Sequence, residues 1–389
     1  MVRNRLTLLA ILIVSVPALA TETLDFEIGK SLFNRNWVSA PASTKADDGL
    51  GPLSDASSCA ACHAGERRDE IMVIRLGNAE GNGDPVYGHQ LQRRGSPGVA
   101  PEANVEIAWH AAGALRTASI HLTDLGYGNL AATTRYALRR PLRIAGIGLL
   151  ARIPEAEILT RADPNDADGD GVSGRPAWII GNDGKRVLGR FGWRASEPTL
   201  RAQTERAFFQ DMGLSTTGNA ESWGECTEVQ PACRSAPQGA SHEETEISDS
   251  MRDLVVAFLN EAPAPRVGSP NARGEKVFGA AGCAACHATP RLTEGRKVLA
   301  YTDLLLHDLG PGLNDGIKEG AAEPGEWRTP PLWGMAASLR AGGLLHDVRA
   351  RNVEEAIEWH DGEAAKARAK MRALSDADKA ALLAFVNGL

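Results

Sequence analysis

Two identical pentapeptides are the residues of this sequence best suited to chemistry. Residues 59–63 and 283–287 both read Cys-Ala-Ala-Cys-His. Two thiols at this spacing can add to the two vinyl groups of a haem, and the imidazole that follows can ligate its iron. The pattern predicts two covalently attached haem c groups, held by Cys59, Cys62, Cys283 and Cys286 and ligated by His63 and His287.

Two other interpretations compete for these motifs. Structural zinc uses paired Cys-x-x-Cys knuckles close together in sequence, whereas these pairs lie far apart and each is followed directly by His. A thioredoxin-like redox motif needs a neighbouring βαβ pattern, and no strand-rich region surrounds either motif. We therefore adopt haem attachment.

Two further cysteines, Cys226 and Cys233, remain after the two motifs are counted. In an exported chain they are expected to form a disulfide that closes a small loop. A reactive thiol pair is the alternative.

The N-terminus is typical of a secretory signal. Arg3 and Arg5 precede an apolar run over residues 6–16, and an Ala-Leu-Ala cleavage site follows at 18–20. No stretch elsewhere approaches the about 20 apolar residues that a membrane-spanning helix needs. We expect residues 1–20 to be removed and the mature chain to be periplasmic and not membrane-spanning.

Composition limits the partners. The 389 residues are 43% hydrophobic and 23% charged, as in ordinary globular proteins. A net charge of −7 argues against nucleic acid as a partner, since such partners usually require a basic patch. A mildly acidic surface suits a small basic redox protein.

The sequence around the first motif is repeated around the second. Residues 29–33 and 274–278 both begin with Gly and end with Phe ahead of the cysteines. Residues 248–260 and 375–387 both follow a Ser-Asp cap signal with helical apolar spacing. An N-terminal helix, a haem motif and a C-terminal helix are the parts of a cytochrome c unit, so we expect two such units.

The expected fold class is therefore mainly α, with two cytochrome c-like domains, long loops and a large insertion in the first. After the signal peptide, the first domain covers residues 21–262 and the second covers 266–389. A proline-rich stretch at 261–270 reads as the linker, because its prolines disfavour helix and sheet.

Longer phrases resemble the di-haem oxidoreductase family, which is described as peroxidase-like or thiol-oxidoreductase-like and is related to the bacterial di-haem cytochrome c peroxidases. In chain order, these phrases are residues 166–175, 189–193, 301–311, 326–334, 344–347 and 354–364. The resemblance covers nearly all of the mature chain and implies two haems. It specifies the reaction less well.

The resemblance also implies one axial ligand. In the peroxidases a His-Asp-Gly phrase is followed fourteen residues later by a Met that ligates the C-terminal haem. In the relatives that form tryptophylquinone a Tyr stands there. Here His346 and Asp347 match the phrase, and His360 follows fourteen residues after His346. His360 is the expected axial partner of His287. We expect His307 and His346 to form hydrogen bonds near the haem edge.

One departure concerns proton transfer. Members of this family usually read Gly-Leu-Leu-Glu where this chain reads Gly-Leu-Leu-Ala, so that Ala151 replaces a Glu. In the peroxidases a Glu near the N-terminal haem assists proton transfer to peroxide. If the replaced Glu had that role, a peroxidase reaction here would be weakened.

A possible calcium loop lies at residues 163–171. Asp166, Asp168 and Asp170 alternate as in the start of an EF-hand loop, although Ala177 stands where the loop's bidentate Glu belongs. An acidic surface turn is the alternative, since Asp and Gly are common turn residues.

These observations predict an oxidoreductase. We expect electrons to pass from the C-terminal haem to an N-terminal haem that reduces peroxide or a similar oxidant. A small cytochrome or cupredoxin would be the electron donor or acceptor. A pure electron-transfer cytochrome and an oxidase that modifies a partner protein remain alternatives.

The paired motifs lead to a first prediction. Intact mass of the protein from maturation-competent cells should equal the chain without its signal peptide plus two haems. A mass with one haem or none would contradict the attachment sites.

Overall fold

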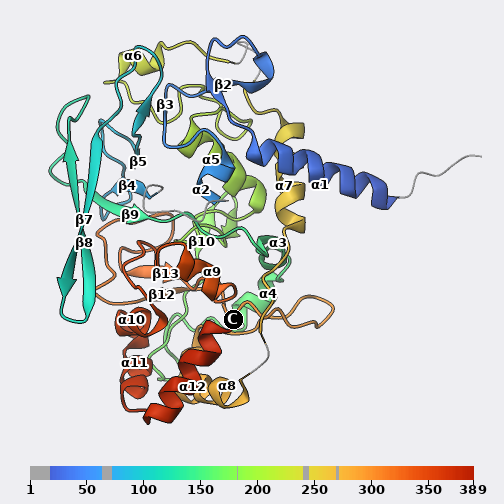
Figure 1. Ribbon diagram of the computed structural model, residues 1–389, viewed down its shortest axis with the longest axis vertical. Helices are drawn as coiled ribbons and strands as arrows, with labels where there is room; N and C mark the ends of the chain where they lie inside the picture. The colour runs from blue at the N-terminus through green and yellow to red at the C-terminus, as the bar shows by residue number, and fades with distance from the viewer. Residues whose placement is uncertain (1–17, 64–71, 182, 240–244, 269–270) are drawn as a thin grey trace, which may run out of the picture.

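The computed structural model describes residues 18–63, 72–181, 183–239, 245–268 and 271–389. In Figure 1 most of the N-terminal part of the chain lies in the upper half of the molecule and the C-terminal helices lie in the lower half. The predicted signal peptide falls mostly on residues 1–17, which lie outside the described residues. No helix in the described part of the chain is both long and apolar enough to cross a membrane.

Helices occur throughout the described chain. They are α1 (Ala18–Asn34), α2 (Cys59–His63), α3 (Ile147–Ala151), α4 (Glu155–Leu159), α5 (Leu200–Met212), α6 (Pro231–Arg234), α7 (Asp249–Glu261), α8 (Ala272–Ala281), α9 (Met335–Arg340), α10 (Val353–Glu358), α11 (Ala365–Arg372) and α12 (Asp376–Asn387). Single 3₁₀ turns lie at Lys45–Asp47, Cys283–Ala285 and Gly362–Ala364.

Strands form several small sheets. They are β1 (Val38–Ser39), β2 (Asp48–Leu50), β3 (Leu53–Ser54), β4 (Val73–Gly77), β5 (Gln90–Leu91), β6 (Arg94–Gly95), β7 (Asn104–Ala112), β8 (Leu115–Thr123), β9 (Arg135–Arg139), β10 (Trp178–Ile180), β11 (Arg186–Leu188), β12 (Leu306–Asp308) and β13 (Glu326–Arg328). In the described residues the order β5-β4-β9 makes a three-stranded sheet, and the other sheets are strand pairs.

The helices at each end of the repeated sequence pack together as pairs. α1 packs against α7, and α8 packs against α12. Both crossings depend on a glycine. A Cβ atom added at Gly29 would lie 2.0 Å from the carbonyl oxygen of Leu254. A Cβ atom added at Gly274 would lie 2.2 Å from the carbonyl oxygen of Ala381. Only a residue without a side chain allows the backbones to approach so closely.

The phenylalanines and caps predicted from the repeat are also confirmed. The rings of Phe33 and Phe258 lie 5.1 Å apart, and those of Phe278 and Phe385 lie 5.3 Å apart. The hydroxyl oxygen of Ser248 accepts a hydrogen bond from the Met251 backbone at the start of α7, and Ser375 caps α12 in the same way.

The expected fold class, by contrast, is wrong. Helices account for 31% and strands for 18% of the described structure, in many small sheets, and it does not show a cytochrome c fold. Much of the strand content lies in β7 and β8, where Val105 and Ile107 alternate with polar residues and pack on the same core as Ile120 and Leu122. An alternation with a period of two indicates a strand with one buried face, and the expectation of a mainly α fold left this signal out.

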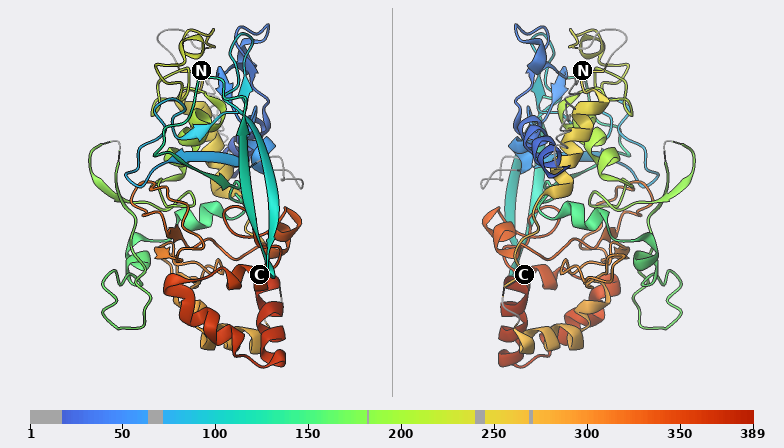
Figure 2. Two further views of the ribbon diagram at one scale, coloured as in Figure 1. Left: turned by 90° about the vertical axis from the view of Figure 1, so that its left-hand side faces the viewer. Right: turned by 90° about the vertical axis from the view of Figure 1, so that its right-hand side faces the viewer.

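The two parts of the chain are interleaved. An isolated bridge pairs Arg175 with Leu306, and the hydroxyl of Ser173 donates a hydrogen bond of 2.6 Å to Glu363. The side views in Figure 2 show the long β7–β8 hairpin reaching from the N-terminal part to the C-terminal part. The division into domains at residues 262–266 stays a prediction.

The glycine crossings lead to a prediction about stability. Gly274→Ala should destabilise the protein by about 1–2 kcal/mol, because the clash of an overpacked contact exceeds the gain in helix propensity. Gly279→Ala is the matched control in the same helix. A Cβ at Gly279 would meet nothing within 4 Å, so this change should be neutral or stabilise by up to about 1 kcal/mol. Urea unfolding measures both, and equal effects would contradict the close crossing.

Candidate functional site

Each Cys-x-x-Cys-His motif lies on the wall of its own cavity. The C-terminal cavity, with a volume of 350 Å³, is lined by Cys283, Cys286 and His287 among other residues. The N-terminal cavity has a volume of 210 Å³, and its lining includes the whole of the other triplet, Cys59, Cys62 and His63. The structure therefore brings every predicted attachment residue to one of two cavities.

Local backbone geometry positions the motifs. The first motif forms the single helical turn α2, and the second begins with a 3₁₀ turn after Gly282, whose φ of 92° ends α8. In a helical turn, residues three apart lie on one face, so the two cysteines of each motif face the same cavity.

Backbone carbonyls orient both proximal histidines. Nδ1 of His63 lies 2.9 Å from the carbonyl oxygen of Leu142, and Nδ1 of His287 lies 3.0 Å from that of Tyr301. An Nδ1–H that donates to a carbonyl leaves the lone pair on Nε2, which is the form that ligates a metal. Both histidines are thus prepared as ligands.

The pKa values of the motif thiols are raised, whereas those of redox cysteines are lowered. Burial, assisted by the nearby Asp211, raises the pKa of Cys59 and Cys62 to about 12. Burial raises the pKa of Cys283 to about 11. Redox Cys-x-x-Cys motifs depend on a lowered thiol pKa, so these surroundings argue against a thioredoxin-like role.

His360 lies across the C-terminal cavity from His287. Their ring centres are 6.5 Å apart, which is close to the roughly 6 Å expected for two imidazoles on opposite sides of one metal ion with bonds of about 2.0 Å. Nδ1 of His360 lies 2.6 Å from the carbonyl oxygen of Ala356, again leaving Nε2 for a metal. Burial lowers the pKa of His360, which favours the neutral imidazole. Its role as a ligand stays a prediction.

The other two histidines of this cavity have different surroundings. Burial alone would lower the pKa of His307, but Asp303, 2.9 Å from Nε2, and Glu363, 2.7 Å from Nδ1, raise it. Each ring nitrogen of His307 thus lies within hydrogen-bonding distance of a carboxylate. The ligand atoms of Cys286, Asp303 and His307 also lie within 4.8 Å of one another, a spacing at which they could hold one metal ion. His346 lies flat against Trp327, with ring centres 3.8 Å apart. Burial lowers its pKa.

A single wall separates the two cavities. The residues that line both are Arg140, Leu142, Arg143, Trp193, Arg328 and Pro331. The indole N–H of Trp193 donates to the carbonyl oxygen of Arg140 at 2.8 Å, and Nε of Arg328 donates to that of Gly192 at 2.9 Å. The cavities are therefore direct neighbours.

The N-terminal cavity differs from its neighbour in the ligands that it offers. Among the described residues that line it, His63 is the only histidine. Its wall also contains Glu319, whose pKa burial alone would raise. Surrounding arginines outweigh the burial and bring this pKa down to about 2. They are Arg75, Arg139, Arg194 and Arg206.

Positions 151 and 197 differ in their relation to the N-terminal cavity. Ala151 ends α3 and lines neither cavity. Glu197 does line this cavity, and burial raises its pKa. In the described part of the chain its carboxylate takes part in no hydrogen bond. Glu197 could not be predicted from the sequence, since nothing in its local pattern marks it.

The acidic loop gathers a slightly different trio from the one predicted. Oxygens of Asp163, Asp166 and Asp168 lie within 4.8 Å of one another. The side chain of Asp170 instead accepts a hydrogen bond of 2.7 Å from the backbone of Val172. The calcium site stays a prediction, with Asp163 in place of Asp170.

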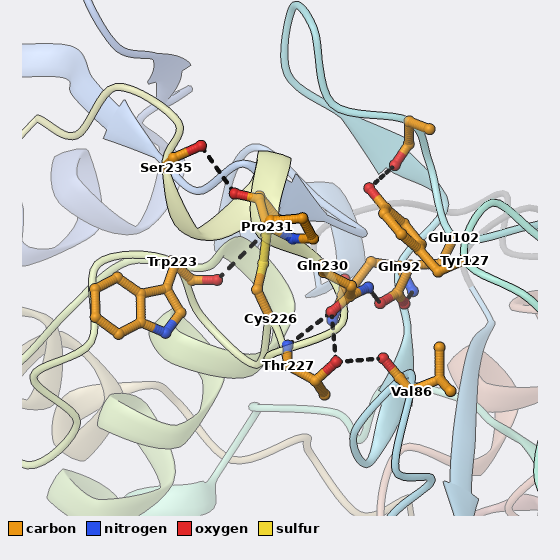
Figure 3. The surroundings of a disulfide bond; sticks show 12 residues. Val86, Gln92, Glu102, Tyr127, Trp223, Cys226, Thr227, Gln230, Pro231 and Ser235 are labelled. Carbon is orange, nitrogen blue, oxygen red and sulfur yellow. Dashed lines mark hydrogen bonds between the residues drawn. A yellow bond between two sulfur atoms is a disulfide. The ribbon is translucent and has the colours of Figure 1, made fainter.

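Cys226 lies next to Cys233, and Figure 3 shows the surroundings of Cys226. Their Cα atoms are 6.1 Å apart, a distance that a disulfide can span. Hydrogen bonds tie the segment to the strand region: Thr227 donates to the carbonyl oxygen of Val86 at 2.7 Å, and Gln230 donates to Glu102 at 2.6 Å. The disulfide itself stays a prediction.

The C-terminal two thirds of the chain match a known family. The family model described as "Di-haem oxidoreductase, putative peroxidase" matches residues 127–389. No curated protein matches the chain. The matched region contains the second motif, whereas the first motif and the β7–β8 hairpin precede it.

The acidic trio leads to a prediction about metal removal. If calcium binds the folded chain preferentially, chelation should lower the melting temperature. Asp166→Asn should lower it without chelator and make the protein insensitive to chelation. An unchanged melting curve, with no metal in elemental analysis, would leave only an acidic turn.

Proposed function

The chain belongs to the di-haem oxidoreductase family, and we propose that it is a periplasmic c-type member that takes electrons in at the C-terminal cavity and delivers them to an oxidant, peroxide or a similar molecule, in the N-terminal cavity. One observation carries this proposal. The C-terminal cavity offers a second imidazole opposite its motif, whereas His63 is the only histidine in the described lining of the N-terminal cavity.

The residues fit the two haems that the family name states. Two thiols and an oriented imidazole face each cavity, and most of the remaining lining of the C-terminal cavity is apolar. When bound, haem supplies one-electron chemistry and an iron that accepts an oxidant only where an axial position is open. In the C-terminal cavity His287 and His360 would occupy both positions. In the N-terminal cavity His63 would fill one position, and the described lining has no second histidine for the other.

The direct test is steady-state consumption of hydrogen peroxide with a small reduced cytochrome or cupredoxin as donor. The proposal expects turnover and high-spin absorption from one of the two haems. Absence of both in every redox state would favour a pure electron-transfer protein.

Proton supply in the N-terminal cavity falls to this chain's own carboxylates. Reduction of peroxide to water consumes protons, so a group in the cavity has to deliver them. Glu197 suits this role because burial raises its pKa, which keeps a proton available nearer to neutral pH. The neighbouring Glu319 does not, because its pKa near 2 keeps it ionised.

His360 leads to a prediction about the C-terminal haem. His360→Met should raise the potential of one haem and leave the other nearly unchanged, since thioether ligation raises haem potential. His360→Ala should open a coordination position and add high-spin absorption. His346→Gln is the control, because its ring lies flat on Trp327. If His360→Ala keeps both haems low-spin, the axial partner of His287 is another residue.

Glu197 leads to a prediction about turnover. Glu197→Gln should lower kcat for peroxide by about 10²–10⁴-fold and remove the ionisation of this carboxyl from the pH profile. Glu228→Gln, at an exposed position outside both cavities, is the control and should leave both unchanged. A variant with unaltered kcat and pH profile would place proton delivery elsewhere.

A further inference from the structure

The β7–β8 hairpin has a polar face that the proposed function does not use. The two strands pair antiparallel from Asn104 opposite Thr123 to Ala112 opposite Leu115. Alternate residues of a strand lie on opposite faces, so Val105 and Ile107 pack inward while Glu106 and His110 project outward. In Figure 1 the hairpin runs along the left edge of the molecule, and the left view of Figure 2, taken from that side, shows it in front.

Two imidazoles meet on this outward face. Nε2 of His110 lies 2.7 Å from Oγ of Ser119, and Nε2 of His121 lies 3.1 Å from the same oxygen. The two Nε2 atoms therefore lie no farther apart than the sum of these distances. Both histidines are exposed, so their rings can rotate slightly and direct both Nε2 atoms toward a single metal ion.

A carboxylate joins them by strand register. Glu106 stands directly opposite His121, and the pair between the two histidines, Ala108 opposite Ser119, is small. Directly opposed side chains have Cβ atoms about 4.5–5.5 Å apart, within reach of a shared ligand. The face thus presents two imidazoles and one carboxylate with no bulky residue between them.

The scaffold beneath these side chains is held in place. Arg116, which points to the other face, donates to the carbonyl oxygen of Val348 at 2.7 Å, and its guanidinium lies 4.2 Å from the ring centre of Trp109. Arg351 donates to the carbonyl oxygen of Ala114 at the hairpin turn, at 3.0 Å. Ligands on a fixed scaffold lose less freedom on binding, which favours affinity.

We propose that His110, His121 and Glu106 form a surface site for a divalent transition-metal ion, Cu²⁺ or Zn²⁺. Imidazole and carboxylate are ligands that both ions accept, at about 2.0–2.2 Å for Zn²⁺. A bound ion replaces the hydrogen bonds of Ser119 with metal–nitrogen bonds. The site lies before residue 127, where the family match begins.

The test uses the full, haem-loaded protein and titrates it with Cu²⁺ and, separately, with Zn²⁺ in a calorimeter. His110→Ala and His121→Ala should each weaken binding at least tenfold, and Glu106→Gln should weaken it less. His89→Ala, at another exposed histidine, is the control and should leave affinity unchanged. Haem absorption and melting temperature confirm that each variant is folded.

Spectroscopy and competition separate the outcomes. Cu²⁺ in the wild-type protein should show electron paramagnetic resonance coupling to two nitrogens, which either His→Ala variant should reduce. Zn²⁺ that displaces Cu²⁺ at comparable concentration would mark the site as zinc-selective, and copper that resists displacement would mark it as copper-selective. The proposal would be overturned if the His110→Ala/His121→Ala double variant bound the metal ion with the same affinity and stoichiometry as the wild-type protein.

Discussion

The protein wall between the two cavities is the feature on which the rest of the structure depends. It buries arginines, and a buried guanidinium is costly unless its N–H groups have acceptors. Arg194, which follows the wall residue Trp193, is fully buried. Its terminal N–H groups donate to Asp315 at 2.8 Å and to the carbonyl oxygen of Pro324 at 3.0 Å, and Trp327 covers its face at 3.6 Å. Arg328 donates to backbone carbonyls on both sides of the wall. These acceptors come from both parts of the chain, so the hydrogen bonds hold the two cavities beside each other, as the proposed electron transfer between them requires.

The two halves of the chain build their motifs in the same way but differ in the residues that face the motif across the cavity. In each half a glycine allows two helices to cross, a pair of phenylalanines packs at the crossing, and a backbone carbonyl orients the motif histidine. The difference lies opposite the histidine. Residues 353–360 bring His360 to the C-terminal cavity, whereas the described wall of the N-terminal cavity is rich in charged and amide side chains. In the proposed function, this difference between the two cavities separates electron entry at the C-terminal cavity from reduction of the oxidant at the N-terminal cavity.

The insertions account for both the failed expectation about fold class and the further site. The sequence shows a helical repeat, but the strands lie inside its two copies, where the repeat gives no indication of them. Most of those strands are two to five residues long and depend on packing against distant residues such as Val348, whereas the nine-residue strands β7 and β8 carry the alternation that the helical expectation left out. The same long hairpin that changes the fold class is the one that lines up His110, His121 and Glu106.

What the sequence determined by itself is the chemistry that depends on short spacing. Two thiols and a histidine within five residues form one turn wherever they fold, and Ser-Asp caps begin helices because their hydrogen bonds are local. The offset that singled out His360 belongs to this group only because a family phrase supplied the register. Tertiary structure alone decided that His360 faces His287, that Glu197 lines a cavity which Ala151 does not reach, and that Asp163 replaces Asp170 in the acidic trio. Each of these depends on where distant backbone segments pack, and packing is set by shape and burial over the whole chain rather than by the spacing of neighbours.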